Sequence, residues 1–365
     1  QSNTTGATNC ALGYGSLSAN TTGNYNNAFG YAALDANTDG NHNCGFGRDA
    51  LGANTSGAKN TAFGNYSLDA NTTGDNNVAF GYYALSAATT ADKNTALGYY
   101  AAADITTGVR NTAVGSEALR QKTTSTDNTA LGFQSMFNSS EGNHNTCVGA
   151  SAGYNISTGQ YNTIVGSAAG DAITVGNENV AMGYGALTST TTGDTNTAIG
   201  RGAMRDNTTG SSNTAVGSFA LDKNTTATRN TAVGSNSGYK LTTGAQNVAI
   251  GFQAMYHGTT ATDNVAVGDH ALANITDSQD NVAMGREAGL NVTSGDNNLL
   301  LGHRAGTDTA PGGTVSTHSN RIVLGDNNMA NAYIKIDWTV GSDKRDKTDI
   351  EPFNHGLSWI TKLNP

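Results

Sequence analysis

The sequence has little proline, cysteine, tryptophan and charge for a chain of its length. Three prolines, three cysteines and two tryptophans occur among 365 residues, and 13% of the residues are charged. Pro311, Pro352, Pro365, Trp338 and Trp359 all lie at or after residue 311, so roughly the first 300 residues form a separate compositional region. This composition is typical neither of a globular enzyme nor of a disordered tail.

Further absences exclude classes of function. No run approaches the length of about 18 apolar residues that a membrane-spanning helix requires, and the N-terminus lacks the basic and apolar segments of a signal peptide. We therefore expect no membrane insertion. A net charge of −9 without a basic stripe argues against a nucleic-acid partner. Cys10, Cys44 and Cys147 are too few and too dispersed for a disulfide framework or a zinc site, and we interpret them as buried thiols.

What the sequence does contain is a repeat. A 17-residue unit that begins with asparagine recurs without insertion from Asn9 to Asn298, and its fifth place is always glycine, as in Asn213-Thr214-Ala215-Val216-Gly217. We number the places of the unit 1 to 17 from this asparagine. The first-place asparagines are Asn9, Asn26, Asn43, Asn60, Asn77, Asn94, Asn111, Asn128, Asn145, Asn162, Asn179, Asn196, Asn213, Asn230, Asn247, Asn264, Asn281 and Asn298.

The period and the glycine content predict a parallel β-solenoid. A helical repeat needs a longer unit, and each glycine inside a helix costs about 1 kcal/mol relative to alanine. Two strands of four or five residues and two glycine-bearing turns fit one unit. We therefore predict about 18 stacked coils, about 4.8 Å apart, in which identical places form ladders.

Two invariant places have physical explanations within such a stack. The asparagine amide is expected to hydrogen-bond to the asparagine of the next coil and to its own turn. The fifth-place glycine is expected to have a positive φ or a close backbone approach that no side chain would tolerate.

Several other places predict how the interior is filled. The ninth and twelfth places compensate in volume: where the ninth is Gly153 or Gly170, the twelfth is Ile156 or Ile173. The pairs Leu272 with Ile275 and Gly306 with Thr309 do not follow this rule. We expect apolar fourth-place residues such as Phe63, Val114 and Ile199 to join this core.

The expected core is thin. A stripe of small residues follows the third and eighth places, as at Ala62 and Ser67, and allows close approach either between chains or between the two sides of one coil. A thin core in a long shape favours lateral association of several copies, so we predict a homotrimer.

The remaining side chains suggest no cofactor and no metal. Histidines and carboxylates do not recur at one place in more than two consecutive coils, so the sequence predicts neither a calcium nor a zinc ladder. Aromatic residues recur at the sixth and seventh places and suit packing or trimer contacts better than sugar stacking; they are Tyr14, Tyr31, Tyr82, Tyr83, Tyr99, Tyr100, Phe133, Tyr184 and Phe252.

The Asn-Thr-Ala-Val-Gly units resemble those of the left-handed parallel β-roll heads of trimeric autotransporter adhesins and the repeats of phage tail-fibre proteins. The likeness covers about 300 residues. It implies a left-handed roll assembled as a trimer. We divide the chain into a solenoid over residues 1–302, an irregular segment with capping strands at Ile322–Leu324 and Tyr333–Ile336 over residues 303–341, and a distinct segment over residues 342–365.

This last segment resembles the start of the C-terminal intramolecular chaperone domain of phage tail spikes and fibres. It contains Ser342-Asp343-Lys344-Arg345-Asp346-Lys347, then Ile350 and the run from Gly356 to Asn364. In that family the domain trimerises the fibre and then cuts itself off. The resemblance implies that Ser342 is the nucleophile and Lys347 the base, since a hydroxyl needs a neighbouring base. The family's domain is longer than this segment, and we expect the chain to be a fragment of a longer fibre.

From these features we expect a structural and adhesive protein: the virion shaft of a phage tail fibre, whose partners are two further copies of itself and a host-surface glycan or protein. No enzymatic activity is expected beyond a single self-cleavage beside Ser342. One alternative is a trimeric autotransporter-type adhesin on a bacterial cell surface. A second is an ice-binding solenoid, suggested by Thr21-Thr22, Thr72-Thr73 and Thr208-Thr209.

Overall fold

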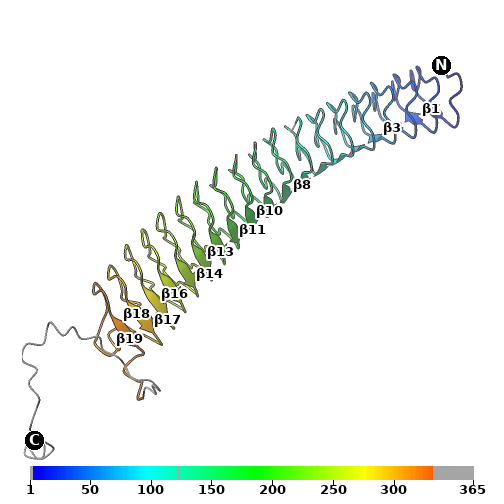
Figure 1. Ribbon diagram of the computed structural model, residues 1–365. Coiled ribbons are helices and arrows are strands. Elements are labelled where there is room, and N and C mark those ends of the chain that lie inside the picture. The colour runs from blue at the N-terminus through cyan, green and yellow to red at the C-terminus, as the bar shows by residue number, and fades with distance from the viewer. Residues whose placement is uncertain (1–2, 122, 332–365) are drawn as a thin grey trace, which may run out of the picture. The chain divides into compact units, whose positions relative to one another are not determined.

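The computed structural model describes residues 3–121 and 123–331, which form a stack of coils with one short strand in each coil (Figure 1). The predicted all-β parallel solenoid is confirmed, with about 17 turns and no helix in the described ranges. The strands are β1 Cys10–Leu12, β2 Asn27–Phe29, β3 Cys44–Phe46, β4 Thr61–Phe63, β5 Val78–Phe80, β6 Thr95–Leu97, β7 Thr112–Val114, β8 Thr129–Leu131, β9 Thr146–Val148, β10 Thr163–Val165, β11 Val180–Met182, β12 Thr197–Ile199, β13 Thr214–Val216, β14 Thr231–Val233, β15 Val248–Ile250, β16 Val265–Val267, β17 Val282–Met284, β18 Leu299–Leu301 and β19 Ile322–Leu324.

Each strand pairs in parallel with the strand of the next coil, in register. Ala62 of β4, for example, lies opposite Ala79 of β5, and Phe63 lies opposite Phe80. The strands therefore form one continuous sheet along one edge of the stack (Figure 1). This registry accounts for the constant 17-residue spacing between Asn9 and Asn298, because an extra residue would have to bulge out of its coil before the next strand could pair in register.

The prediction of two strands per unit is wrong. Each coil has a single three-residue strand at places 2 to 4, and turns make up the rest. The reason is a set of left-handed residues: Gly64 at place 5 has a φ of +140°, Tyr66 at place 7 has +60°, Leu68 at place 9 has +50° and Asn76 at place 17 has +57°. Residues other than glycine rarely adopt a positive φ. Backbone hydrogen bonds between coils offset the cost, such as that from the N–H of Leu68 to the carbonyl of Ala84, 3.0 Å.

The interior of each coil is narrow and apolar. Ala62 at place 3 and Leu68 at place 9 are completely buried within the single chain. Places 3 and 8 face each other: a Cβ on Gly45 would lie 3.0 Å from the carbonyl oxygen of Ala50, and the Ser237 hydroxyl donates to the carbonyl of Ala249 at 2.6 Å. The small-residue stripe therefore brings together the two sides of one coil.

The placement of the fourth-place residues in the core is also wrong. The middle residue of a strand points inward and its two neighbours point outward, so Phe63 is 41% exposed and Ile199 is 37% exposed, and Val114 is half-buried. The alternation of a β-strand decides this placement, because places 2 and 4 lie on the face opposite to place 3.

The solenoid continues past the last regular unit. Strand β19 pairs with β18 in register, and Leu299 lies opposite Ile322, 23 residues further along the chain. The residues between Gly302 and Ile322 thus form one enlarged coil. The second expected capping strand, Tyr333–Ile336, lies outside the described residues, as do Ser342 and Lys347.

The cysteines do not share one environment. Cys147 is buried as expected, whereas Cys44 is half-buried and Cys10 is exposed on the first strand. Cys10 and Cys44 occupy place 2, which faces outward, and Cys147 occupies place 3, which faces inward. Nothing within residues 3–121 and 123–331 forms a helix that could cross a membrane.

Candidate functional site

The first-place asparagines form an unbroken hydrogen-bonded ladder through the interior. The main-chain N–H and the Nδ2 of Asn162 donate to Oδ1 of Asn145 at 2.9 and 3.0 Å. The same Nδ2 donates to the carbonyl of Gly176 at 2.9 Å, which holds the turn at place 15. Asn179 in turn donates to Oδ1 of Asn162. One amide therefore links three coils, and neither aspartate nor leucine could supply both its donor and its acceptor.

A second asparagine ladder lies at place 12, which the sequence analysis treated only as a filler of volume. Nδ2 of Asn37 donates to Oδ1 of Asn20 at 2.8 Å, and Asn54 and Asn71 extend the row. The row ends where place 12 becomes Ala88, and Oδ1 of Asn71 is left buried without a partner. The repeated Asn-Thr-Thr-Gly motif was the signal that could have revealed this ladder.

Threonine hydroxyls at place 13 are also used within the stack. The hydroxyl of Thr21 donates to the carbonyl of Thr38 at 2.9 Å, and Thr72 and Thr208 make the same bond to the next coil. These hydroxyls are part of the structure that joins the coils.

The fifth-place glycines stack against one another with no room for a side chain. A Cβ on Gly166 would lie 2.6 Å from the carbonyl oxygen of Gly183, and φ at Gly166 is +135°. Both expected reasons for the invariant glycine, the positive φ and the close backbone approach, are therefore present.

The volume compensation inside the coils involves three places. Cβ atoms on Gly153 and Gly170 would meet Ile156 and Ile173 of their own units at 2.8 and 2.9 Å, as expected. The exception at Gly306 is explained by place 3, because Leu300 fills the space with its Cδ2 3.1 Å from the position of that Cβ.

The other exception is explained by the neighbouring coil. The side chain of Leu272 reaches toward the next coil, where its Cδ2 would lie 2.6 Å from a Cβ on Gly289. Space that glycine leaves in one coil is thus filled from the same coil or from an adjacent one.

The outward face of the strands is uncharged along its whole length: its fourth place is always apolar, and its second place is most often threonine or valine. No residue at places 2 and 4 of strands β1–β19 is charged. The fourth-place side chains that are more than a third exposed are Leu12, Phe46, Phe63, Phe80, Leu97, Leu131, Met182, Ile199, Ile250, Met284 and Leu324. We call places 2 and 4 of these strands the strand face.

Toward the N-terminus, the strand face and the corner beside it carry aromatic ladders. The rings of Phe46, Phe63 and Phe80 are stacked at 4.7 and 4.6 Å between centroids. At the sixth place, Tyr14 stacks on Tyr31, with centroids 5.5 Å apart. Because these rings stack along the solenoid, each covers the face of its neighbour and exposes mainly an edge.

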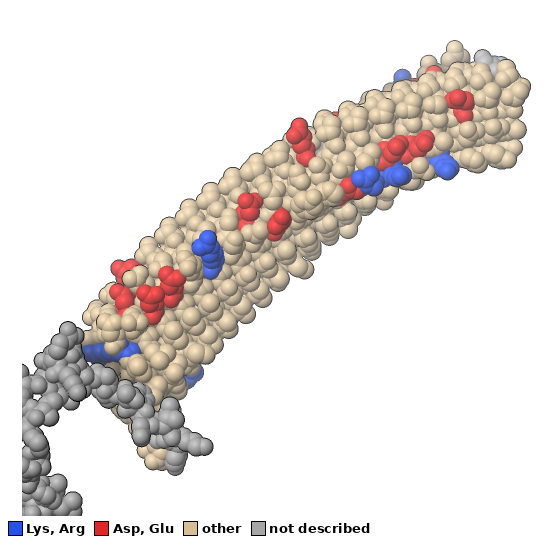
Figure 2. Space-filling model, viewed as in Figure 1, with Lys and Arg blue, Asp and Glu red and all other residues tan. Residues whose placement is uncertain are grey.

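Charged groups are few and scattered over the side of the stack that Figure 2 shows. One cluster is partly buried: Asp222, completely inaccessible, accepts from Arg205 at 2.9 Å and lies 3.4 Å from Lys223. Burial raises the pKa of Asp222, and the two cations oppose that rise. Burial also raises the pKa of Asp69 to about 6, with the backbone N–H groups opposing it and Asp49 adding to it.

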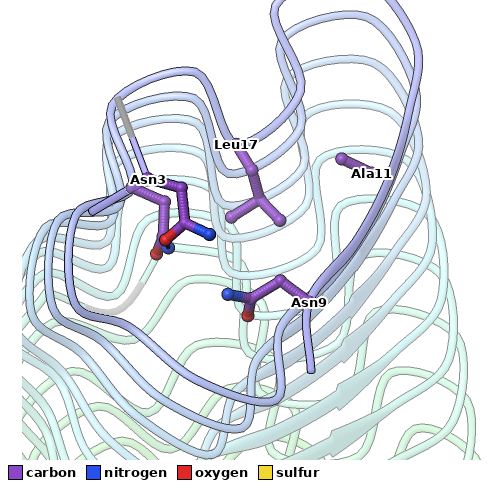
Figure 3. Close-up of a pocket in the computed structure, with 5 residues that line it drawn as sticks. Asn3, Asn9, Ala11 and Leu17 are labelled. Atoms are coloured by element: carbon purple, nitrogen blue, oxygen red, sulfur yellow. Dashed lines mark hydrogen bonds between the residues drawn. The ribbon is translucent and has the colours of Figure 1, made fainter. Parts of the chain in front are cut away.

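The first described coil shows the interior end-on. Asn3, Asn9, Ala11, Leu17 and Asn20 line a pocket there, and Figure 3 shows Asn3, Asn9, Ala11 and Leu17 around the opening. Asn3 and Asn20 occupy place 12 and the others places 1, 3 and 9, and the equivalent residues of the next coil, Asn26, Ala28, Leu34 and Asn37, are buried. The opening is therefore the solenoid's own cross-section.

Neither the described residues nor the comparisons identify a catalytic or metal site. Among residues 3–121 and 123–331, no group of three or more histidine, cysteine, aspartate or glutamate side chains is placed to hold a metal ion. The chain matches no protein-family model and no curated protein. The strand face, which runs along strands β1–β19, is therefore the candidate functional surface.

Proposed function

We propose that this protein is the trimeric, structural and adhesive shaft of a phage tail fibre that holds a host-binding end away from the virion. The observation that carries the proposal is the strand face, an uncharged stripe with an apolar side chain at place 4 of every strand, on a regular stack of coils. A stack joined by asparagine and glycine ladders supports a rod, and an apolar stripe supports side-by-side association of rods.

The size of the strand face supports association. Side chains exposed to this degree contribute roughly 60 to 100 Å² each, so the exposed fourth-place residues present on the order of 800 Å². Monomeric proteins rarely expose a contiguous apolar patch of more than a few hundred Å², and a standard interface buries about 800 Å² on each partner.

The pattern of the face favours further copies of this chain as the partners. Its side chains recur once per coil, and a second copy presents the same spacing along the whole length. Two such faces do not repel each other, since neither carries a charge. The trimer, rather than a dimer, follows from the resemblance to tail fibres and adhesin heads.

The proposal is tested by the solution mass of the chain. Light scattering should give a trimer for the wild type and a monomer for the double variant Phe63→Glu, Phe80→Glu. The matched control is Thr73→Glu, Thr90→Glu, which adds the same charge on the same coils at exposed places away from the strand face. A monomeric wild type, or a double variant that stays trimeric, would contradict the proposal.

The self-cleavage assigned to Ser342 and Lys347 is part of the proposal and is tested in a longer chain that includes a complete chaperone domain. We expect such a chain to release the domain, and Ser342→Ala to abolish the release. Release of an intact chaperone from the Ser342→Ala variant would overturn the assignment.

One observation favours a different function. Threonines at place 2 face outward on five consecutive strands, Thr95 to Thr163, as a regular row beside apolar residues. A regular outward threonine row is also what an ice-binding solenoid would present. Thermal hysteresis measured on the Phe63→Glu, Phe80→Glu variant distinguishes the ice-binding function from the tail-fibre function. The ice-binding function predicts hysteresis, and the tail-fibre proposal expects none.

A further inference from the structure

The corner between the sixth and seventh places contains a notch in one part of the stack. Most units carry a side chain at place 7, but two consecutive units have Gly185 and Gly202 there. A Cβ on Gly185 would meet only the Thr188 hydroxyl, at 3.3 Å. The ring of Phe219 closes one end, 2.7 Å from the position of a Cβ on Gly202.

The notch is lined by aromatic and cationic side chains. Tyr184, Arg201, Arg205 and Phe219 surround the two glycines. The guanidinium carbons of Arg201 and Arg205 lie 5.2 and 5.8 Å from the ring centre of Phe219, a cation–π arrangement that holds both cations beside the opening.

The tyrosine of the notch differs from the tyrosines of the N-terminal coils. Tyr14 and Tyr31 stack on each other, as do Tyr82 and Tyr99. Among the described residues, no other ring makes such a contact with Tyr184, which is 65% exposed. No other described ring covers Tyr184, and it is more exposed than the stacked Tyr31, Tyr82 and Tyr99, which are 52%, 42% and 53% exposed.

One cation that lines the notch has no carboxylate partner among the described residues. Arg205 pairs with Asp222 and Asp206, and Lys223 pairs with the same two carboxylates. Arg201 makes no ion pair with a described residue, so it contributes a surplus positive charge in a chain of net charge −9.

A buried acceptor lies beneath the opening. Oδ1 of Asp222 has no hydrogen-bond partner within the described residues and would lie 3.8 Å from a Cβ on Gly202. Oδ1 of Asp69 and of Asp171, at the same place in other coils, is also buried without a partner in the described part of the chain, so this atom offers the notch an available acceptor and does not by itself identify a ligand.

We propose that this notch binds an acidic sugar, with the sugar ring against the ring of Tyr184 and its carboxylate on the guanidinium of Arg201. Guanidinium groups recognise carboxylates by charge-assisted hydrogen bonds, and an aromatic ring supplies a flat apolar surface. The inference deepens the proposed attachment function and rests on it, because it gives the chemical class of the host-surface ligand.

The test is a calorimetric titration of the full chain with a galacturonic acid trisaccharide and with its methyl ester, which has a neutral methyl ester in place of each carboxylate. We expect the acid to bind at least about tenfold more tightly than the ester. Arg201→Gln should lower the affinity for the acid by about tenfold or more. Tyr184→Ser should weaken both. The matched controls, Arg229→Gln and Phe133→Ser, should change neither affinity; Phe133 is also an exposed sixth-place ring.

Three outcomes would overturn the inference: no binding of the acid by the wild type, equal binding of the ester, or unchanged binding by Arg201→Gln. Inorganic phosphate is titrated in parallel, and phosphate binding equal to that of the sugar would refute recognition of a sugar ring. The solution mass of each variant keeps the two proposals apart, because a trimer that does not bind the acid contradicts the notch alone.

Discussion

Ala62 and Phe63 are neighbours in one strand, yet one is completely buried and the other is 41% exposed. The inner face of the strands consists mostly of alanine packed inside a single chain, whereas the fourth place of the outer face carries large apolar residues that this chain leaves in contact with solvent. Apolar character alone therefore does not show whether a residue of the strand lies in the core. The inner face stabilises the coil, and under the proposed function the outer face joins the coils of different chains.

The largest effect is expected from enlarging the inner face. Ala62→Leu places extra carbons opposite Leu68 in a closed interior and should lower the free energy of unfolding by about 3 kcal/mol or more, whereas Phe63→Leu next to it should change that value by less than about 1 kcal/mol. Urea denaturation of both variants measures the difference.

A second substitution sharpens this result. Large third-place residues occur opposite a ninth-place glycine, as Ile164 opposite Gly170 and Leu300 opposite Gly306. The double variant Ala62→Leu, Leu68→Gly should therefore recover part of the lost stability. An additive loss would show that the three-place compensation is wrong.

Nearly as large an effect is expected at the glycine stack. Gly166→Ala puts a Cβ 2.6 Å from a backbone oxygen at a φ of +135°, and such strain costs about 3 kcal/mol. Gly52→Ala is the control, because place 10 carries side chains in other units, and its melting temperature should stay within a few degrees of the wild type. Equal losses in the two variants would contradict the assigned role of the fifth place.

The asparagine ladder should respond somewhat less. Asn162→Ala removes the acceptor for Asn179 and the donor for the carbonyl of Gly176, and buried groups left unpaired cost about 1 to 3 kcal/mol. Asn27→Ala, on the outward strand face, is the control and should be nearly neutral in the same denaturation experiment. Hydrogen exchange should show faster exchange at the main-chain N–H of Asn179 in the first variant only.

The smallest effect concerns pH. Because the pKa of Asp69 is raised to about 6 in the folded chain, the folded state favours the protonated acid. The contribution of Asp69 to the free energy of unfolding is therefore fully present below the unfolded pKa near 3.8. It is lost as the pH rises toward 6, by on the order of 1 kcal/mol after solvent screening. Asp69→Asn should flatten the dependence of melting temperature on pH between about 4 and 6. A pH dependence that is the same in the wild type and in Asp69→Asn would refute the raised pKa, since groups with lowered pKa values such as Asp127 and Glu287 contribute to both slopes equally.

Much of the fold could be predicted because it follows from strict periodicity. The 17-residue period fixed the in-register parallel stack, and the invariance of Asn162 and Gly166 and of their equivalents indicated ladders that tolerate no substitution. The exchange between Gly153 and Ile156 revealed a shared interior space.

The asparagine ladder at place 12 escaped prediction although its residues recur in the sequence, whereas other features that escaped have no signature in the type of a single residue. A three-residue strand is too short for alternation to show which side faces inward, so Phe63 was placed in the core on its apolar character. The left-handed conformation of Leu68 is set by bonds to the next coil, and leucine itself gives no indication of it. The notch at Tyr184 depends on Gly185 and Gly202, whose role is visible only once the seventh places are aligned in space.

The in-register stack also has a genetic consequence. Because each unit closes one coil and pairs only with its two neighbours, an in-frame duplication of a whole unit would lengthen the rod by one coil without changing any other pairing. Such events should be harmless where the flanking interiors match, as between the units of Leu51 and Leu68, which both have asparagine at place 12. A duplication beside Gly153 should be selected against, because the copied unit would place a second large side chain in interior space that Ile156 already fills. The length of the shaft can thus evolve in steps of one unit, at sites that the interior determines.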